Sequence, residues 1–238
     1  RINKYLSEQG ICSRREADKL VEQKRITING ITAGPGSRVN PGDEVLLDNK
    51  CISKKEDKRI YMAFNKPVGI TCTTDKAIPG NIVDFINYPE RIFHVGRLDK
   101  DSQGLILMTN DGDIVNKILR ATNNHEKEYI VTVNKPVTEA FIEGMSSGVK
   151  ILNTVTKPCT VIKLDRYVFK IILTQGLNRQ IRRMCSFFDY KVIKLKRIRI
   201  MNIELGSLPT GHWRYLTDEE LRILDSLIST SIKTEEAK

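Results

Sequence analysis

The stretch GRLDKDSQGL, residues 96–105, places charged side chains between two apolar runs. Arg97, Asp99, Lys100 and Asp101 fall within five positions. The flanking runs, IFHV and GLILMTN, are typical of strands, so we expect the charges on a loop held between two rigid elements. A carboxylate there could act as a nucleophile, an acid–base group or an electrostatic stabiliser. The spacing alone also permits a surface turn with incidental ion pairs.

A second charged segment, GLNRQIRRMCSFF at residues 176–188, has the pattern of an amphipathic helix. Its apolar positions follow the spacing of one buried face: Ile181, Met184, Cys185 and Phe188. Between positions 179 and 199 the only acidic residue is Asp189, against eight basic ones: Arg179, Arg182, Arg183, Lys191, Lys194, Lys196, Arg197 and Arg199. Because the local sequence supplies so little neutralising charge, we expect these side chains to contact phosphates.

Composition favours a polyanionic partner. The formal net charge is +10, and no basic amphipathic helix with a strong aromatic face appears, so nucleic acid is favoured over a membrane surface. No apolar window approaches the roughly 18 residues of a membrane span, and the N-terminal residues show no apolar signal region. The five cysteines are widely separated and odd in number, which indicates a reducing compartment. We expect a cytoplasmic protein.

Other chemistries lack the required patterns. The histidines His94, His125 and His212 have no metal-ligand spacing, and no P-loop or dinucleotide fingerprint occurs. GMSSG at 144–148 matches G-x-S-x-G, but a helical pattern precedes it and a β-type run follows, the reverse of a nucleophile elbow. The sequence therefore predicts neither a metal nor a cofactor.

The pattern of residues 1–50 predicts a small module of two helices and short strands. Ser13 and Glu16 have capping-box spacing at the start of the second helix. That helix and the residues after it carry five basic side chains: Arg14, Arg15, Lys19, Lys24 and Arg25. A solvated face is the usual explanation for such a run. In so small a helical pair we favour nucleic-acid binding instead.

After a polar linker, with a boundary near residue 58, β-type and helical patterns alternate irregularly. Strands are expected near 60–65, 92–95, 104–109, 128–134, 160–164, 167–174 and 191–203. Helices are expected near 81–87, 112–121, 138–146, 178–188 and 217–229, the last with capping-box spacing between Thr217 and Glu220. This order predicts an α+β fold with a mostly antiparallel mixed sheet and flanking helices.

Four ordered motifs together resemble the RsuA/RluB/RluE/RluF family of pseudouridine synthases. They are GRLDKDSQGL, NKPVG at 65–69, EKEY at 126–129 and GLNRQIRRM at 176–184. Residues 1–50 resemble an S4 RNA-binding domain, and the whole resemblance extends to about residue 225. The stretches NHEKEY, TVTKPC and RIRIMNI resemble most the branch that acts on large-subunit ribosomal RNA.

The resemblance implies roles for three residues of the site. Asp99 matches the family's essential aspartate. Arg97 matches an arginine that enters the RNA helix where the target uridine has left. Tyr129 matches the tyrosine that stacks on the uracil.

Further matches concern residues around the aspartate. Arg182 best matches the basic residue that pairs with it, although Arg179 and Arg183 are close enough in sequence to take that place. Such a pair favours the ionised form of a carboxylate. Lys66 and Pro67 match a motif that supports the catalytic loop.

The resemblance implies an S4-like RNA-binding domain with its linker at 1–58, a pseudouridine synthase domain at 59–230 and a polar tail at 231–238. We expect a monomer, without a cofactor, that isomerises a uridine in a stem-loop of folded 23S ribosomal RNA, with a tRNA as a conceivable further substrate. The alternatives are a 16S enzyme of the same family, a non-catalytic S4-type assembly factor, and a DNA-binding regulator that uses residues 2–23.

Overall fold

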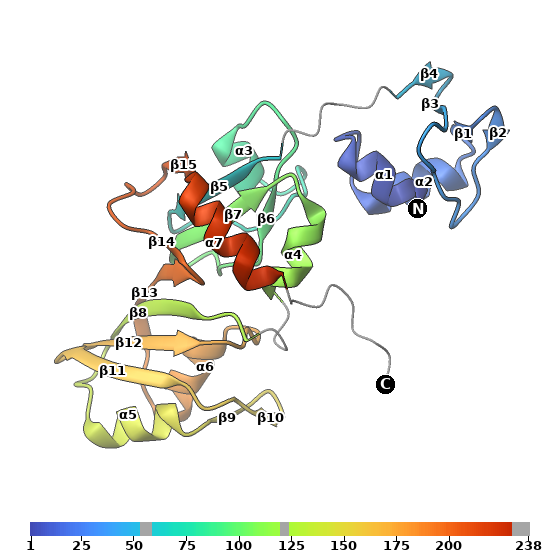
Figure 1. Ribbon diagram of the computed structural model, residues 1–238. Coiled ribbons are helices and arrows are strands. Elements are labelled where there is room, and N and C mark those ends of the chain that lie inside the picture. The colour runs from blue at the N-terminus through green and yellow to red at the C-terminus, as the bar shows by residue number, and fades with distance from the viewer. Residues whose placement is uncertain (53–58, 120–123, 230–238) are drawn as a thin grey trace. The chain divides into compact units, whose positions relative to one another are not determined.

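The computed structural model describes residues 1–52, 59–119 and 124–229. The chain separates into two compact units, Arg1–Arg59, drawn in blue in Figure 1, and Ile60–Lys238, drawn in the colours from cyan to red. Most of the predicted linker, residues 53–58, and the predicted polar tail at 231–238 lie outside the described residues.

The first unit packs two helices against a four-stranded sheet of order β2-β1-β3-β4. Its elements are α1 (Ile2–Glu8), α2 (Arg14–Glu22), β1 (Ile26–Ile28), β2 (Ile31–Thr32), β3 (Val45–Leu47) and β4 (Lys50–Cys51). The predicted capping box is confirmed: Ser13 accepts a hydrogen bond from the Glu16 amide, and the Glu16 carboxylate accepts one from the Ser13 amide. Asn29 and Gly30 both have positive φ and close the β1–β2 hairpin.

The second unit is built on a nine-stranded sheet of order β11-β12-β8-β13-β7-β5-β15, with β14 paired to β13 and β6 to β7. The strands are β5 (Tyr61–Lys66), β6 (Phe93–Val95), β7 (Gln103–Thr109), β8 (Lys127–Val133), β11 (Thr160–Asp165), β12 (Val168–Leu173), β13 (Val192–Ile200), β14 (Ile203–Glu204) and β15 (Trp213–Tyr215). Among the described strands of this sheet, β13 and β7 form the one parallel pair. The predicted mostly antiparallel mixed sheet is confirmed.

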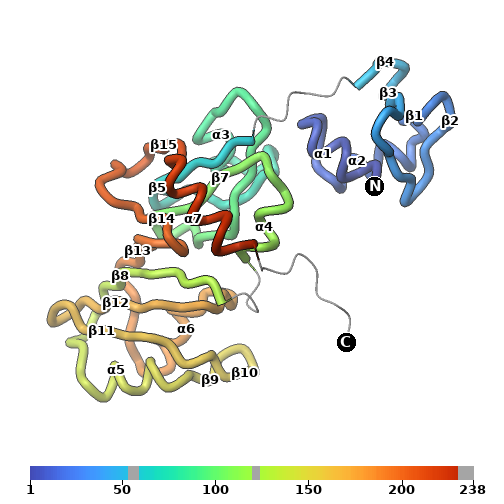
Figure 2. Tube along the Cα trace, viewed as in Figure 1, coloured from blue at the N-terminus to red at the C-terminus, as the bar shows by residue number. Residues whose placement is uncertain are grey.

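Five described helices accompany this sheet: α3 (Ile82–Ile86), α4 (Gly112–Leu119), α5 (Glu139–Ser146), α6 (Gln180–Phe187) and α7 (Asp218–Ile228). Four of them form two groups. Figures 1 and 2 show α4 and α7 at the β7–β5 end of the sheet, and α5 and α6 at the β11–β12–β8 end. Two buried clusters result: one joins Phe64, Phe141 and Phe169, and the other lies beneath α4 and α7.

The predicted elements agree with the structure to within a few residues, with two differences. The expected strand at 191–203 is divided, because Met201 has a positive φ of 53° and ends β13 before β14 begins. The sequence patterns did not predict β15 or the second strand of the small hairpin β9 (Lys150–Ile151) and β10 (Thr154–Val155). The last residues of the helix expected at 112–121 lie outside the described residues.

Candidate active site

A pocket of about 700 Å³ opens near the middle of the large sheet. Its walls come from segments that are distant in sequence: the loop at residues 96–102, hereafter the aspartate loop; β8; β13; and residues 175–182 at the start of α6. Among the residues that line it are Arg97, Asp99, Tyr129, Arg179 and Arg182. The fold therefore brings the catalytic candidates of three separate motifs into one cavity.

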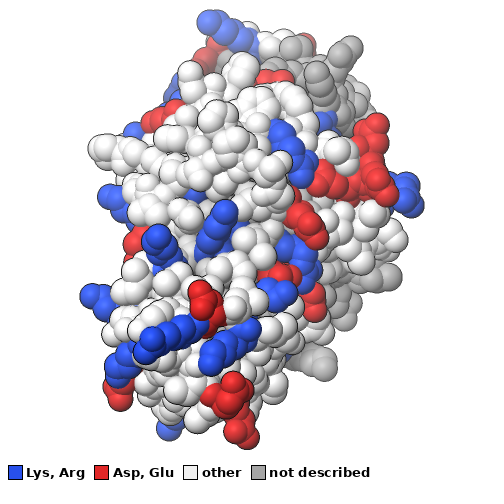
Figure 3. Space-filling model, turned by 90° about the vertical axis from the view of Figure 1, so that its left-hand side faces the viewer, with Lys and Arg blue, Asp and Glu red and all other residues white. Residues whose placement is uncertain are grey.

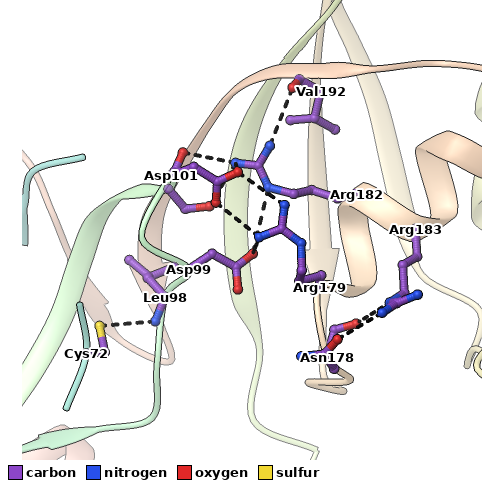
Figure 4. A network of polar contacts seen from close by, with 10 residues as sticks. Cys72, Leu98, Asp99, Asp101, Asn178, Arg179, Arg182, Arg183 and Val192 are labelled. Carbon is purple, nitrogen blue, oxygen red and sulfur yellow. Dashed lines mark hydrogen bonds and ion pairs between the residues drawn. The ribbon is translucent and has the colours of Figure 1, made fainter. Parts of the chain in front are cut away.

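Asp99 faces two arginines rather than one. Arg179 Nη1 lies 3.5 Å from Asp99 Oδ2, and Arg182 Nε lies 3.7 Å from the same oxygen. Figure 4 shows both guanidinium groups pointing toward the aspartate loop, whereas Arg183 turns away and donates to the backbone and side-chain oxygens of Asn178. The side chain of Arg182 is 14% exposed and that of Arg179 is 42% exposed, so Arg182 is the more enclosed partner.

Asp101 is a second carboxylate in this network, to which the sequence patterns gave no separate role. Its Oδ2 lies 3.2 Å from Arg179 Nη2 and 3.3 Å from Arg182 Nη2. Burial raises the pKa of Asp101, but the hydrogen bonds from Arg179 and the charges of Arg182 and Arg179 outweigh it and leave the pKa below its usual value. The negative charges of two carboxylates and the positive charges of two guanidinium groups thus neutralise one another at the pocket wall.

Backbone contacts fix the aspartate loop. The Gly69 amide donates to the Lys100 carbonyl at 2.7 Å, and the Leu98 amide donates to Cys72 Sγ at 3.4 Å (Figure 4). Arg182 Nη2 donates to the Asp101 carbonyl at 3.0 Å and also to Ser102 Oγ at 3.1 Å. Arg182 therefore holds the backbone of the loop as well as its carboxylates.

The NKPVG segment lies beside this loop. Lys66 is fully buried and donates from Nζ to the Pro67 carbonyl at 2.7 Å. Burial lowers the pKa of Lys66, while Cys72, Asp101 and Asp99 oppose that effect. These contacts are those of a group that supports the turn at residues 67–69, whose Gly69 amide contacts the aspartate loop.

Gly104 allows β7, the strand after the aspartate loop, to approach β13 closely. Its φ is +110°, and a Cβ atom there would clash with the Arg197 carbonyl oxygen. Gly104 and Arg197 are partners in the parallel β7–β13 pairing. A side chain at position 104 would force apart the two strands that position the pocket.

Tyr129 forms the floor of the pocket. It lies on β8, is 8% exposed and receives the guanidinium of Arg197 over its ring, with Cζ 6.0 Å from the ring centroid. Arg197 is 3% exposed and donates from Nε to the Leu105 carbonyl at 2.7 Å. Arg197 was expected to contact an RNA phosphate; in the structure its guanidinium lies against the Tyr129 ring and is almost fully enclosed at the pocket lining.

Arg199 also departs from its expected role. Its guanidinium pairs with Glu126 at 2.9 Å and Glu128 at 2.8 Å. These acids lie about 70 positions earlier in the chain, so local sequence could not reveal the neutralisation. Lys194 and Lys196 alternate with the pocket residues Leu195 and Arg197 and therefore lie on the opposite face of β13.

The other expected RNA contacts are exposed. Arg97 lies at the pocket and Arg183 on α6, and the first unit presents Arg14, Arg15 and Lys19 on α2. On the face drawn in Figure 3, basic side chains are interspersed with acidic ones rather than gathered in one uniform area. The candidate phosphate contacts are therefore individual side chains near the pocket and on α2.

Other chemistries gain no support from the described residues. Within them no group of three or more His, Cys, Asp or Glu side chains could hold a metal ion. No described helix combines the length and apolar character needed to cross a membrane. GMSSG spans the end of α5 before β9, which confirms that it is not a nucleophile elbow.

Comparison with known proteins gives consistent matches. The model of the family described as RNA pseudouridylate synthase matches residues 60–187, and the S4 domain model matches residues 1–45. The "Dual-specificity RNA pseudouridine synthase RluF" of Escherichia coli (strain K12) is 58% identical over 97% of this chain and 80% of that protein. The "Ribosomal large subunit pseudouridine synthase B" of Bacillus subtilis (strain 168) is 30% identical over 95% of this chain and 96% of that protein. A solved structure, "Crystal structure of pseudouridylate synthase", superposes with a TM-score of 0.70 at 30% identity, covering 94% of this chain and 99% of the other.

Proposed function

The chain belongs to the family of RNA pseudouridine synthases, and from this premise we propose that it converts a uridine of folded 23S ribosomal RNA into pseudouridine. The S4 domain supplies RNA binding, and the second unit carries the reaction. The name of one relative supports the choice of substrate, because it refers to the large ribosomal subunit. The name of another gives it dual specificity for RNA. The single observation that carries the proposal is the pocket that joins Asp99, Tyr129 and Arg182.

The reaction breaks the bond between ribose C1′ and uracil N1, turns the base and joins C5 to C1′. While the base is detached, the ribose has cationic character and the ring is an anion. We propose that the Asp99 carboxylate acts at C1′, held in place by Arg179 and Arg182. Tyr129 offers its ring face to the extruded base, with Arg197 covering the other face.

Extrusion of the base from its stem costs a few kcal/mol, which contacts to the RNA backbone can offset. We propose that Arg97 occupies the place of the extruded base, since it is exposed and lies at the pocket beside Asp99. Arg183, Lys194 and Lys196 are proposed as peripheral phosphate contacts. The arrangement then separates binding, at exposed cations, from chemistry, at enclosed groups.

Replacing Tyr129 by phenylalanine keeps the stacking ring and tests the role of the hydroxyl group. The ring face is kept, so the affinity for RNA should stay within about threefold of that of the parent. The single-turnover rate should fall by about 10-fold to 100-fold if the hydroxyl assists removal of the proton from C5. Tritium release from RNA labelled at uridine C5 measures this rate. An unchanged rate would show that the hydroxyl is dispensable.

Neutralising α2 tests the role of the S4 domain. A variant in which Arg14, Arg15 and Lys19 are all replaced by methionine should bind RNA more weakly, with a salt slope of log K reduced by about 2. The rate on saturating RNA should persist, because the pocket lies wholly in the second unit. The matched control, Arg14→Lys with Arg15→Lys, keeps the charge and should keep the slope. A slope unaltered in the methionine variant would show that α2 does not touch the RNA backbone.

Pseudouridine mapping in the organism that carries the gene tests the choice of substrate. Deletion of the gene should remove a modification from 23S ribosomal RNA. Loss of a 16S site instead, with 23S unchanged, would contradict the large-subunit assignment. Total tRNA should be mapped in the same strain, because a relative is named as having dual specificity and this chain could likewise modify a second class of RNA.

A further inference from the structure

Lys127 is a lysine inside the pocket that the chemistry above does not use. It lies two residues before Tyr129 on β8, so the two side chains share the face of the strand that lines the pocket. Their Cα atoms are about 7 Å apart by the rise of a strand. Lys127 is only 8% exposed. Lys127 therefore lines the cavity on the same face of β8 as the proposed stacking surface, largely shielded from solvent.

The hydrogen-bonding capacity of Lys127 is only partly used. Nζ donates one hydrogen bond, to the His125 carbonyl at 3.1 Å. An ammonium has three donors. Within the described part of the chain no carboxylate forms an ion pair with Lys127, and the charge that acts on it is that of Arg197, another enclosed cation. Donors thus remain for a guest in the pocket.

This arrangement is unfavourable for the protein alone. Burial, followed by the positive charge of Arg197, lowers the pKa of Lys127 from 10.5 to about 8. Enclosing a cation beside another cation without an acidic partner costs folding free energy, and an apolar side chain of similar length would avoid that cost. A destabilising charge kept in a ligand pocket indicates a functional role.

We propose that the ammonium of Lys127 binds a carbonyl oxygen of the extruded uracil and stabilises the negative charge of the ring while the ring is detached from the ribose. This inference rests on the proposed function. The electron pair of the C1′–N1 bond leaves with the ring, spreads over N1 and the carbonyl oxygens, and forms the new C5–C1′ bond. The C5 proton is released and N1 takes one up, while Lys127 keeps its own proton throughout.

Burial favours the base over a phosphate as the guest. The phosphates of an extruded nucleotide stay with the backbone, where the exposed side chains of Arg97 and Arg179 lie. Lys127 instead shares the enclosed end of the pocket with Tyr129. The site would then hold a carboxylate for the cationic ribose and an ammonium for the anionic ring.

A kinetic comparison separates this role from others. Lys127→Met and Lys127→Gln should each lower the single-turnover rate at saturating RNA by about 100-fold, as loss of a donor to developing charge does. The Kd for RNA should stay within about threefold. The matched control Lys163→Met, at an exposed position of β11, should leave both quantities unchanged.

Thermal stability gives a readout that a structural lysine would not produce. The charged and titratable groups around Lys127 are Arg197 on β13, Tyr129 on β8, His125 before β8 and, on the other walls of the pocket, His94, Asp99 and Arg182. Folding lowers the pKa of Lys127, so between pH 8 and 10.5 the unfolded chain binds more protons than the folded chain. The free energy of unfolding of the wild type therefore increases as pH rises through that range. Lys127→Met should be at least as stable as the wild type at pH 7, with an advantage that shrinks toward pH 10.

Three results would overturn the inference. An unchanged rate for both variants would show that Lys127 is idle. A raised Kd with the salt slope of log K reduced by about one, at an unchanged saturating rate, would show a phosphate contact. A rate loss that vanishes when activity is expressed per folded molecule would show a structural lysine. If the wild-type chain releases no tritium from ribosomal RNA, both the proposed function and this inference fail. If the wild-type chain is active and the Lys127 variants are equally active, the inference alone fails.

Discussion

Asp99→Asn is expected to abolish turnover while RNA binding persists. Asparagine keeps the size of the side chain but removes the charge that we propose acts at ribose C1′, so the single-turnover rate should fall on the order of 10⁴-fold. Arg179 and Arg182 retain Asp101 as an ion-pair partner, which should preserve the pocket wall. Tritium release measures the rate, and filter binding measures the Kd, which should change less than about threefold.

The control for this variant is Asp165→Asn, at an exposed position of β11. It should match the wild type in both rate and affinity. A rate for Asp99→Asn within about tenfold of the wild type would remove Asp99 from its central place. Asp101, the other carboxylate held by the same arginines, would then be the group to test.

Arg182→Met should also produce a large loss of rate. The side chain contacts Asp99 and Asp101 and donates to the Ser102 hydroxyl, so its removal frees both the carboxylates and the backbone of the aspartate loop. Arg179 would remain as an ion-pair partner of both carboxylates, but their orientation and that of the loop backbone would be less fixed. We expect the rate at saturating RNA to fall on the order of 100-fold. Methionine is similar in length, so the packing of α6 should persist.

Arg183→Met is the matched comparison on the same helix. Arg183 contacts Asn178 rather than the aspartates, so its loss should weaken RNA binding through a phosphate contact and leave the saturating rate unchanged. Equal effects of the two substitutions on that rate would show that the ion pairs to the aspartate loop do not matter for turnover. Arg179→Met, which leaves Arg182 in place, should then be compared with them.

Local patterns predicted the elements of this fold well, for identifiable reasons. Ser13 and Thr217 each begin a helix with the capping box that their spacing to a glutamate predicts. The apolar positions of α6 bury Ile181, Met184 and Cys185 as helical periodicity requires. These features depend on residues three or four positions apart, so the sequence contains the necessary information.

Features that depend on distant segments could not be predicted in this way. Arg199 looked unpaired because Glu126 and Glu128 reach it only across the β8–β13 pairing. Arg197 looked like a surface cation until the parallel pairing with β7 and the contact with Tyr129 enclosed it. The role of Lys127 was likewise hidden, since nothing in its neighbouring sequence shows that it faces a cavity.

The sharing of Asp99 between two arginines has a similar origin. Arg179 adopts a left-handed backbone conformation, with φ of 48°, immediately before α6, and this conformation accompanies its approach to the aspartate loop. Helical periodicity alone placed Arg179 among the residues of the helix. The family resemblance favoured Arg182 as the partner of Asp99 and left Arg179 and Arg183 as alternatives. In the structure both Arg182 and Arg179 lie close to Asp99, whereas Arg183 contacts Asn178.

The central claim is tested most directly by tritium release from ribosomal RNA labelled at uridine C5 and isolated from a strain that lacks this gene. With the wild-type chain, 23S RNA should release close to one tritium per molecule at completion and show one new pseudouridine on mapping, while Asp99→Asn should release none. Tight binding of the wild-type chain to the same RNA without tritium release would contradict the account and indicate an RNA-binding protein in which Asp99 is idle.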